Sequence, residues 1–474
     1  MTSVESPGMD DFTTGESSDE AGHARRRVLI ISYCYPPLAT MGTVRPTKLV
    51  KYLPGYGWES TVLTVAEDKT KWVRDQMCDE REGTEIVRAP FPDILSFARS
   101  TLSRAGIVKP GEPGADSVLT VSAGPSSRSG AGLLQRTFSL AKSWASFPDR
   151  YLLWAPFAIA AGLREMKRNA YDAILSSTPP VTNHIVASAL ARLTGVPWLA
   201  DYRDPFTGNA YWEHTRVQRL VAPALERLIL RPAGAVTTVS RPLADDLEAL
   251  LGDRPAGVHE VTNGYDPDDF TGDVTPRAGV FSLTFTGLLY GGKRELRPLL
   301  EVIEDLVSEG RVDPAKIRVR MFGPVYPELE EARDRLRHPE IVEINGVVSR
   351  GVSIEMQRKS TVLLNVIWDD PYTAKGYGGK IFEYLAAGRP VLAWNPSGGV
   401  LDDLIQRTGA GVSVKDGPAL KAVLEEWLDE FDRTGTVTFR GDPDEVRKYG
   451  WDRLSGEFAG ILDRLVSNDS ASGG

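Results

Sequence analysis

Short apolar runs rich in β-branched residues alternate with helical patterns through most of the chain, and they form two successive series. Runs of this kind are typical of parallel strands that are covered by helices on both faces. The first series predicts strands at 28–35, 60–65, 85–89, 173–177, 198–202, 235–239 and 259–262. The second predicts strands at 282–286, 317–322, 342–344, 361–367, 390–393 and 411–414. Two series in one chain predict an α/β fold with two doubly wound domains that face each other across a cleft.

The segments outside this alternation set the expected domain limits. Residues 1–24 are acidic and polar and bury too little apolar surface to fold, so we expect a disordered tail. Residues 103–132 are rich in glycine, proline and serine, which predicts a flexible insertion within the first domain. The two domains are then expected at 25–270 and 280–440. Apolar residues at three- and four-residue spacings predict one amphipathic helix over 444–466.

Composition excludes several classes of protein. Apolar residues make up 42% of the chain and charged residues 25%, as in ordinary globular proteins. The net charge of −9 gives no broad basic surface for nucleic acid, so no nucleic-acid partner is expected. Cys34 and Cys78 are the only cysteines in the sequence, which argues for reduced thiols and against a secreted, disulfide-stapled protein.

Targeting and metal signals are also missing from the sequence. The N-terminus lacks the basic end and apolar run of a secretory signal, and the apolar stretch 151–163 is too short to cross a membrane. We expect a buried helix there, or else an interfacial one, in a cytoplasmic protein. The histidines are scattered, and Asp266 and Asp268 lie in a turn-rich stretch, so we expect no tightly bound metal. No G-x-G-x-x-G occurs, so no nicotinamide dinucleotide is indicated either.

A glycine-rich loop that leads into a helix is the most informative motif. In AKGYGGKIFEYLAAGRPVLAW, residues 374–394, the glycines of the loop directly precede the helix. Their N–H groups and the helix N-terminus, which carries roughly +0.5 charge, form a cradle for phosphate. Lys380 adds positive charge in the first turn, and Glu383 one turn further is placed to accept hydrogen bonds from a ribose diol. A tight loop–helix junction without a ligand is the alternative.

A second glycine loop, FTGLLYGGKRE at 285–295, follows the first strand of the second series. Lys293 and Arg294 open the next helix, where positive charge opposes the helix dipole unless an anion lies between them and the backbone. Opposite the Lys380 loop, these two residues would form a diphosphate clamp. A solvated basic turn is the alternative that this motif leaves open.

Two motifs in the first series mark the other side of the expected cleft. YCYPPLATMGTVRPTKL at 33–49 places Gly42 and Arg45 between a strand and a helix, although a proline-stiffened turn explains it equally well. ADYRDPF at 200–206 places Arg203 and Asp204 at the C-terminal end of a strand, the edge that faces the ligand crevice in open α/β sheets. Asp204, which precedes a proline, is alternatively a turn residue.

Taken in order, these motifs resemble a known family. The chain is similar to the retaining glycosyltransferases of family 4 (glycosyl transferases group 1), which have two Rossmann-like domains in the GT-B arrangement. The resemblance runs from about residue 27 to 466 without the insertion. It rests on the motifs above and on SSTPPVTNHIVA at 176–187, VPWLADYRDPF at 196–206, TTVSRPLADDL at 237–247 and VTNGYDPDDF at 261–270.

The resemblance implies an activity and its partners. A sugar would pass from a nucleotide diphospho-sugar, bound mainly by the C-terminal domain, to an acceptor bound mainly by the N-terminal domain, with retention of anomeric configuration. The final helix, at 441–467, would cross back to the N-terminal domain. The acceptor class stays open between a sugar, a lipid-linked molecule and a small molecule. A lipid-linked acceptor would bring peripheral contact with the inner membrane surface.

The resemblance also implies residue roles. Glu383 matches the acid that holds the donor ribose, and Lys293 matches the basic residue that contacts the diphosphate. The implied catalytic residues are Lys293, Arg294, Lys380, Arg203 and Asp204. The implied substrate-binding residues are Glu383, Gly376, Tyr377, Gly378, Gly379, Gly287, Gly42 and Arg45.

Three positions depart from the family pattern. Lys375 lies where the family's paired-glutamate motif has an acid, and Leu288 lies where many members have an arginine. Residues 201–204 replace a segment that has a histidine in many members. The departures at Lys375 and Leu288 keep open a catalytically silent sugar-nucleotide-binding partner protein. Another enzyme of the same GT-B architecture, such as a nucleotide-sugar 2-epimerase or a pyridoxal-dependent phosphorylase, is a second alternative.

Overall fold

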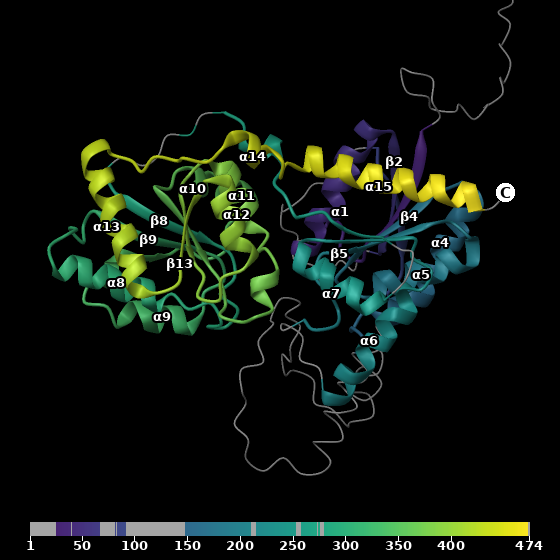
Figure 1. The fold of residues 1–474 in the computed structure, drawn as a ribbon, viewed down its shortest axis with the longest axis horizontal. Coiled ribbons are helices and arrows are strands. Elements are labelled where there is room, and N and C mark those ends of the chain that lie inside the picture. The colour runs from purple at the N-terminus through teal and green to yellow at the C-terminus, as the bar shows by residue number, and fades with distance from the viewer. Residues whose placement is uncertain are drawn as a thin grey trace, which may run out of the picture.

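The computed structural model describes residues 25–38, 40–66, 81, 83–91, 147–209, 215–252, 257–272, 274 and 279–472. The described part forms the two doubly wound domains that the sequence predicts, each built on one parallel sheet (Figure 1). The acidic tail at 1–24, the insertion at 103–132 and Cys78 lie outside the described residues.

The N-terminal sheet has seven strands in the order β3-β2-β1-β4-β5-β6-β7, and each neighbouring pair is parallel. The strands are β1 (Arg26–Ile31), β2 (Trp58–Val65), β3 (Glu85–Ala89), β4 (Ala173–Thr178), β5 (Trp198–Tyr202), β6 (Ala235–Thr238) and β7 (Gly257–Glu260). The order reverses between β1 and β4. In such sheets the ligand crevice lies outside the carboxyl ends of the strands at this point.

Helices cover both faces of this sheet. They are α1 (Met41–Tyr52), α4 (Ala155–Arg168), α5 (Thr182–Thr194), α6 (Arg216–Leu230) and α7 (Arg241–Leu251). Successive residues of β1 point to opposite faces. Leu29 and Ile31 therefore join the apolar cluster of α4, α5 and α6, whereas Val28 and Ile30 join a cluster with Leu49 of α1.

The C-terminal sheet repeats this arrangement with six parallel strands in the order β10-β9-β8-β11-β12-β13. They are β8 (Phe281–Thr286), β9 (Ile317–Phe322), β10 (Val342–Ile344), β11 (Val362–Val366), β12 (Val391–Trp394) and β13 (Gly411–Val414). The helices are α8 (Arg297–Ser308), α9 (Pro327–Asp334), α10 (Arg350–Arg358), α11 (Lys380–Ala387), α12 (Val400–Thr408) and α13 (Gly417–Thr434). Both sheets thus present a crevice of the same type.

The end of the chain returns to the N-terminal domain, as the sequence predicts. Helix α15 (Trp451–Ser472) lies along that domain in Figure 1, and Phe458 and Leu462 share an apolar cluster with Val28. The single helix expected over 444–466 is instead two helices, α14 (Pro443–Arg447) and α15. The break occurs because the backbone around residue 450 pairs with Tyr265, whose carbonyl accepts from the Trp451 N–H.

None of the helices in the described part of the chain is both long enough and apolar enough to cross a membrane.

Candidate active site between the two domains

A cavity of about 180 Å³ lies between the two domains, and both predicted sides of the cleft contribute to its wall. Predicted site residues in the wall are Arg45, Arg203 and Asp204 of the N-terminal domain and Arg294, Gly376, Tyr377, Gly378, Gly379 and Glu383 of the C-terminal domain. The fold therefore brings together residues that lie more than 300 positions apart in the sequence. Of the predicted site residues, Gly42, Gly287, Lys293 and Lys380 lie outside this wall.

The glycine loop is held in place from two directions. The ring of Tyr377 contacts Phe382 edge-on at 5.5 Å between centroids, and burial raises the pKa of the Tyr377 hydroxyl to about 12. A Cβ atom on Gly376 would lie 3.8 Å from Leu243 of α7, so the loop reaches the N-terminal domain. Within the described part of the chain, no side chain caps α11 after Gly379. The Ile381 N–H already donates to the Gly378 carbonyl, and the other N–H groups of this first turn are available to an anion.

Glu383 lies one turn into α11, with its carboxylate buried at the base of the cleft. Its oxygens accept hydrogen bonds from Arg350 at 2.5 Å, Lys380 at 2.9 Å and Gln357 at 3.1 Å. Burial opposes the charge, but Lys380 and Arg350 outweigh it and lower the pKa of Glu383 to about 2. A carboxylate offers roughly four acceptor sites. The three bonds from described residues therefore leave Glu383 able to accept one from a ribose hydroxyl.

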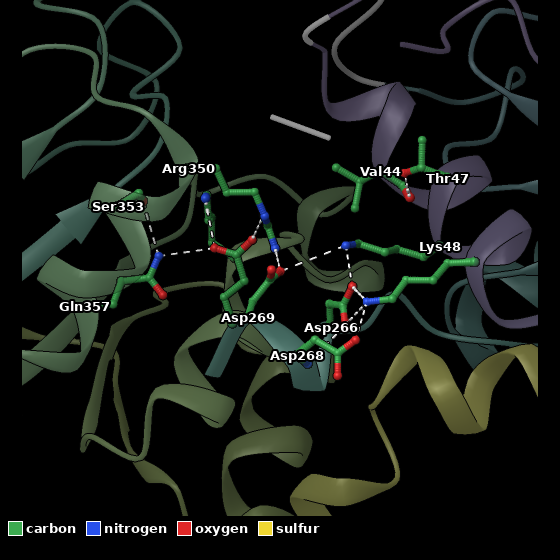
Figure 2. A network of polar contacts seen from close by, with 12 residues as sticks. Val44, Thr47, Lys48, Asp266, Asp268, Asp269, Arg350, Ser353 and Gln357 are labelled. Carbon is green, nitrogen blue, oxygen red and sulfur yellow. Dashed lines mark hydrogen bonds and ion pairs between the residues drawn. The ribbon is translucent and has the colours of Figure 1, made fainter. Parts of the chain in front are cut away.

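Arg350 connects this carboxylate to the linker between the domains (Figure 2). Its guanidinium donates to Glu383 and, at 2.7 Å, to Asp269 of the short helix η3 (Pro267–Phe270). Asp269 lies 3.9 Å from the amine of Lys48 on α1, which also donates to Asp266 at 2.5 Å. Burial disfavours the charge of Arg350, but Glu383 and Asp269 more than compensate and raise its pKa. A chain of alternating charges thus runs from Glu383 to α1.

Arg294 is the basic residue that reaches the cavity from the second glycine loop. A Cβ atom on Gly378 would lie 3.9 Å from its Nη2 atom, so Arg294 and the first glycine loop lie on the same side of the cleft. Its Nε–H is buried and has no acceptor among the described residues. The neighbouring Lys293 places its amine 4.3 Å from the ring centroid of Trp368. The second glycine loop therefore carries two positive charges, and the Nε–H of Arg294 has no acceptor among the described residues.

Gly42 and Gly287 lie outside the cavity wall. A Cβ atom on Gly42 would lie 3.2 Å from Cβ of Cys34, so Gly42 lets the start of α1 approach the end of the first strand. Gly287 directly follows β8 with a φ of 150°, a backbone conformation that favours glycine. The roles of these two glycines toward a substrate stay predictions.

Arg45 is more deeply buried than the sequence suggests, with 1% of the residue exposed. It donates two bonds to Asp201, through Nε at 2.9 Å and Nη2 at 2.7 Å. Its other N–H groups donate to the carbonyls of Val261 and Thr262 and to the side chain of Asn263. Each N–H of Arg45 therefore has a protein acceptor. The geometry explains Arg45 as a clamp between α1, β5 and the linker.

Arg203 and Asp204 form the polar part of the N-terminal wall. The guanidinium of Arg203 donates to the Asp204 carboxylate through Nε at 3.1 Å and Nη2 at 3.0 Å. Both residues are partly exposed to the cavity, unlike Arg45. They line the same cavity as the glycine loop of the opposite domain.

Lys375, which departs from the family pattern, makes a contact between the two domains. Its amine donates to both carboxylate oxygens of Asp246 on α7, at 2.8 Å and 2.6 Å, and its backbone carbonyl accepts from the hydroxyl of Ser240. Lys375 therefore joins the loop before α11 to the opposite domain. The position that carries an acid in the family here supplies a contact between domains.

A larger cavity, of about 440 Å³, lies between α8 and α9 and shares Arg294 with the cleft. Its remaining charged lining consists of Glu295, Glu301, Glu304, Glu328, Glu331, Arg297 and Arg335. The excess of carboxylates disfavours a diphosphate there, so the cleft is the better candidate for an anionic substrate. Among the described residues, no group of three or more His, Cys, Asp or Glu side chains is arranged to hold a metal ion.

The partners of Glu383 include residues that the sequence did not single out. Arg350 and Gln357 come from outside the recognised motifs, and Asp269 lies in VTNGYDPDDF, a motif for which no site role was predicted. Nothing in the local sequence of Arg350 and Gln357 distinguishes them from ordinary surface residues. Their importance follows from long-range contacts that only the folded chain makes.

Two Rossmann-like domains, a cleft between them and a final helix that returns to the first domain define the GT-B architecture. Residues 42–264 match a family model described as a glycosyl transferase 4-like domain. A comparison with curated proteins gives no match. Over residues 42–264 the chain is therefore similar to glycosyl transferase 4-like domains, and its fold is of the GT-B type.

Solved structures share this architecture over nearly the whole chain. Sucrose-phosphate synthase from Thermosynechococcus elongatus superposes with a TM-score of 0.62 at 12% identity, over 94% of this chain and 100% of that chain. Anabaena HepE, solved in complex with UDP and glucose, gives 0.59 at 12% identity, over 93% and 100%. A glycosyltransferase from Rickettsia africae gives 0.54 at 14% identity, over 94% and 100%. Identities this low show a common fold.

Proposed function

We propose that this protein transfers a sugar from a nucleotide diphospho-sugar to an acceptor with retention of anomeric configuration. The observation that carries the proposal is Arg294, whose buried Nε–H lacks an acceptor among the described residues beside the glycine loop. Leaving such a donor unpaired costs about 1–3 kcal/mol. A phosphate oxygen of the donor would satisfy it. The UDP and glucose bound to HepE, which has the same fold, are ligands of this kind.

The donor would bind with its ribose at Glu383 and its diphosphate between Arg294 and the loop Gly376–Gly379. Lys380 lies at the rim of the cleft. Its side chain is partly exposed, and its amine donates to Glu383 at 2.9 Å. Lys293 is one residue from Arg294 and adds charge to the same loop. These groups place positive charge where the diphosphate leaves.

The reaction breaks the bond between the anomeric carbon and the diphosphate oxygen, and it forms a bond from that carbon to the acceptor oxygen. The acceptor's proton passes to the leaving phosphate oxygen on the same face, so no protein base is required. Preorganised donors that stabilise a developing anion are each worth about 10²–10³ in turnover. Arg294 and the first-turn N–H groups of α11 would supply this stabilisation, and Arg203 and Asp204 would position the acceptor.

We expect this site to work without a bound metal, because arginine, lysine and backbone N–H groups supply the positive charge. The cavity of about 180 Å³ is smaller than the roughly 300–1,000 Å³ usual for small-molecule sites. We therefore expect the two domains to separate further when a whole nucleotide sugar enters.

The test is a transfer assay with a panel of nucleotide diphospho-sugars and sugar, lipid-linked and small-molecule acceptors, with and without a chelator. We expect nucleoside diphosphate release in step with product, unchanged by the chelator, and an anomeric configuration by NMR that matches the donor. Inverted product would overturn the mechanism. Donor binding without turnover across the whole panel would overturn the proposed activity.

A further inference from the structure

Tyr290 lies in the second glycine loop with its backbone in the left-handed region. Its φ is 53°, and among the described residues it is the single non-glycine residue with a positive φ. Gly291 and Gly292 follow it with φ values of 60° and 79°, so the loop adopts such a conformation at three successive positions. Glycine does so without steric cost, whereas the Cβ atom of a tyrosine crowds the backbone there. Strain of this kind is typical of positions whose side chain has a functional role.

Backbone hydrogen bonds hold the loop in this strained conformation. The Lys293 N–H donates to the Tyr290 carbonyl at 3.4 Å. The Arg294 N–H donates to the Leu289 carbonyl at 3.1 Å. The backbone of Tyr290 also forms a hydrogen bond with the side chain of Tyr326, which directly precedes α9. None of these bonds uses the Tyr290 side chain, so the loop should keep its path with a glycine at this position.

The ring of Tyr290 packs against the guanidinium of Arg294. The Cζ atom of Arg294 lies 4.8 Å from the ring centroid, within the range of a cation–π contact. Both residues line the cleft, where the Nε–H of Arg294 has no acceptor among the described residues. Because the backbone bonds already set the path of the loop, the ring acts on the direction of the Arg294 side chain.

Arg294 also borders a second cavity that competes for its charge. It lines the cavity of about 440 Å³ between α8 and α9, whose wall carries five glutamates and two other arginines. This excess of negative charge attracts a guanidinium. An Arg294 side chain without support would therefore turn away from the cleft, and the contact with the Tyr290 ring opposes that rotation.

We propose that Tyr290 is a positioning residue that keeps Arg294 directed into the cleft, toward the diphosphate of the donor. The inference rests on the proposed function, because that function places the diphosphate beside Arg294. Tyr290 would act through the arginine and not on the reacting atoms. The strained backbone then has an explanation, since the loop alone would favour glycine at this position.

The test is a double-mutant cycle of Tyr290→Gly and Arg294→Ala, with inorganic pyrophosphate as the probe and titration calorimetry as the measurement. Arg294→Ala removes a charged donor and should weaken pyrophosphate binding about tenfold. Tyr290→Gly removes the cation–π contact and should weaken it about threefold or more. Added to Arg294→Ala, Tyr290→Gly should have no further effect, because it acts through that arginine. The conservative variant Tyr290→Phe keeps the ring and should retain most of the affinity.

Thermal unfolding separates a positioning role from a purely structural one. Tyr290→Gly relieves the left-handed strain, so its melting temperature should equal or exceed that of the parent. A ring that only stabilises the fold would give a melting temperature well below that of the parent with unchanged pyrophosphate affinity, and this result would overturn the proposal.

The failure of this inference and the failure of the proposed function give different results. Unchanged pyrophosphate affinity in Tyr290→Gly, or an equal loss with and without Arg294, would overturn the role of Tyr290 and leave the proposed function intact. A parent that binds no pyrophosphate, or an Arg294→Ala variant that binds it as the parent does, would remove the diphosphate site on which both proposals rest. Pyrophosphate carries no base or sugar, so these results do not depend on which donor and acceptor the protein uses.

Discussion

Arg350 and Glu383 form an ion pair of 2.5 Å that joins helix α10 to helix α11 beneath the cleft. The same guanidinium donates to Asp269 in the linker between the domains. One arginine therefore ties the carboxylate expected to hold the donor ribose to the segment about which the domains would move. The geometry makes Arg350 a positioning residue that acts through Glu383.

Replacing Arg350 should weaken nucleotide binding without touching the nucleotide itself. Arg350→Ala leaves Glu383 without its shortest hydrogen bond, so we expect about a tenfold loss of affinity for a nucleoside diphosphate, or roughly 1.4 kcal/mol. Arg350→Lys keeps the positive charge but lacks the planar guanidinium that donates to Glu383 on one side and to Asp269 on the other. It should therefore recover part of the lost nucleotide affinity. Isothermal titration measures both.

The matched control is Arg335→Ala, which removes an exposed arginine directly after α9. It should leave the affinity unchanged. Equal losses in Arg350→Ala and Arg335→Ala would show that Arg350 has no particular link to Glu383.

We expect Arg45 to contribute to the stability of the fold and Arg203 to contribute to turnover of the acceptor. Arg45 is buried and paired with Asp201, and removing one partner of a buried ion pair typically costs 3–5 kcal/mol. Arg45→Ala should therefore lower the free energy of unfolding by about that amount. Arg203 is paired with a partly exposed Asp204, and such pairs contribute about 0–1 kcal/mol. Arg203→Ala should leave stability nearly unchanged while reducing acceptor turnover.

Denaturant unfolding and initial rates at varied acceptor concentration separate these effects. If Arg45→Ala were as stable as the parent but inactive, Arg45 would be a substrate-binding residue after all. If Arg203→Ala lost stability and kept its turnover, the account of the acceptor side would be wrong.

The sequence predicted the architecture well because the strands of both sheets are rich in apolar, β-branched residues, and the central strands are buried. β3, β5, β9, β10 and β13 have the limits expected from their apolar runs. It did less well where tertiary contacts decide the outcome. The break before α15 depends on pairing between Tyr265 and Gly450, residues far apart in the chain, and no local pattern announces it.

The same distinction between local pattern and long-range contact applies to the candidate site. The glycine loops and Glu383 were found from the sequence because loop, helix start and charge are neighbours in it. Arg45 was expected at the cleft from its position after Gly42, but its partner Asp201 was not recognised, and that pairing accounts for its burial. Lys375 looked like a departure from the family, and its contact with Asp246 became visible only between folded domains.

Lys293 and Arg294 should differ in kinetic effect. Arg294 lines the cavity and faces charge that grows as the donor bond breaks, so Arg294→Ala should lower kcat about 10²–10³-fold. Lys293 lies over Trp368, so its charge acts from a greater distance, and Lys293→Ala should lower kcat by a smaller factor. In both variants donor affinity should fall less steeply than kcat. Full turnover in Arg294→Ala would remove the main support for the diphosphate site.

His184 makes stability depend on pH in a defined direction. Burial lowers its pKa from 6.5 to about 3, although nearby Asp201 acts in the opposite direction. Below pH 6.5 the unfolded chain takes up a proton that the folded chain refuses, so stability falls by up to about 1.4 kcal/mol per pH unit from this group.

Thermal unfolding of the parent and His184→Leu between pH 7 and about pH 4 measures this contribution, since other groups cancel in the comparison. The parent should lose stability faster than the variant as the pH falls. Parallel curves would mean that His184 is protonated in the folded protein. The exposed His338, replaced by glutamine, serves as the control.

The role of Glu383 as the ribose-binding residue is tested most directly by the affinity ratio between a nucleoside diphosphate and its 2′,3′-dideoxy analogue. Titration calorimetry measures this ratio for the parent and for Glu383→Ala. A hydrogen bond to a charged group contributes about 1.5–3 kcal/mol, so the parent should prefer the ribose form at least tenfold. The ratio should fall to about one in Glu383→Ala, provided that its circular dichroism spectrum matches that of the parent. Because both ligands carry the same phosphates, the freed charges of Arg350 and Lys380 cancel in the ratio. An unchanged preference in Glu383→Ala, or no preference in the parent, would contradict the assignment of the cleft as a nucleotide-sugar site.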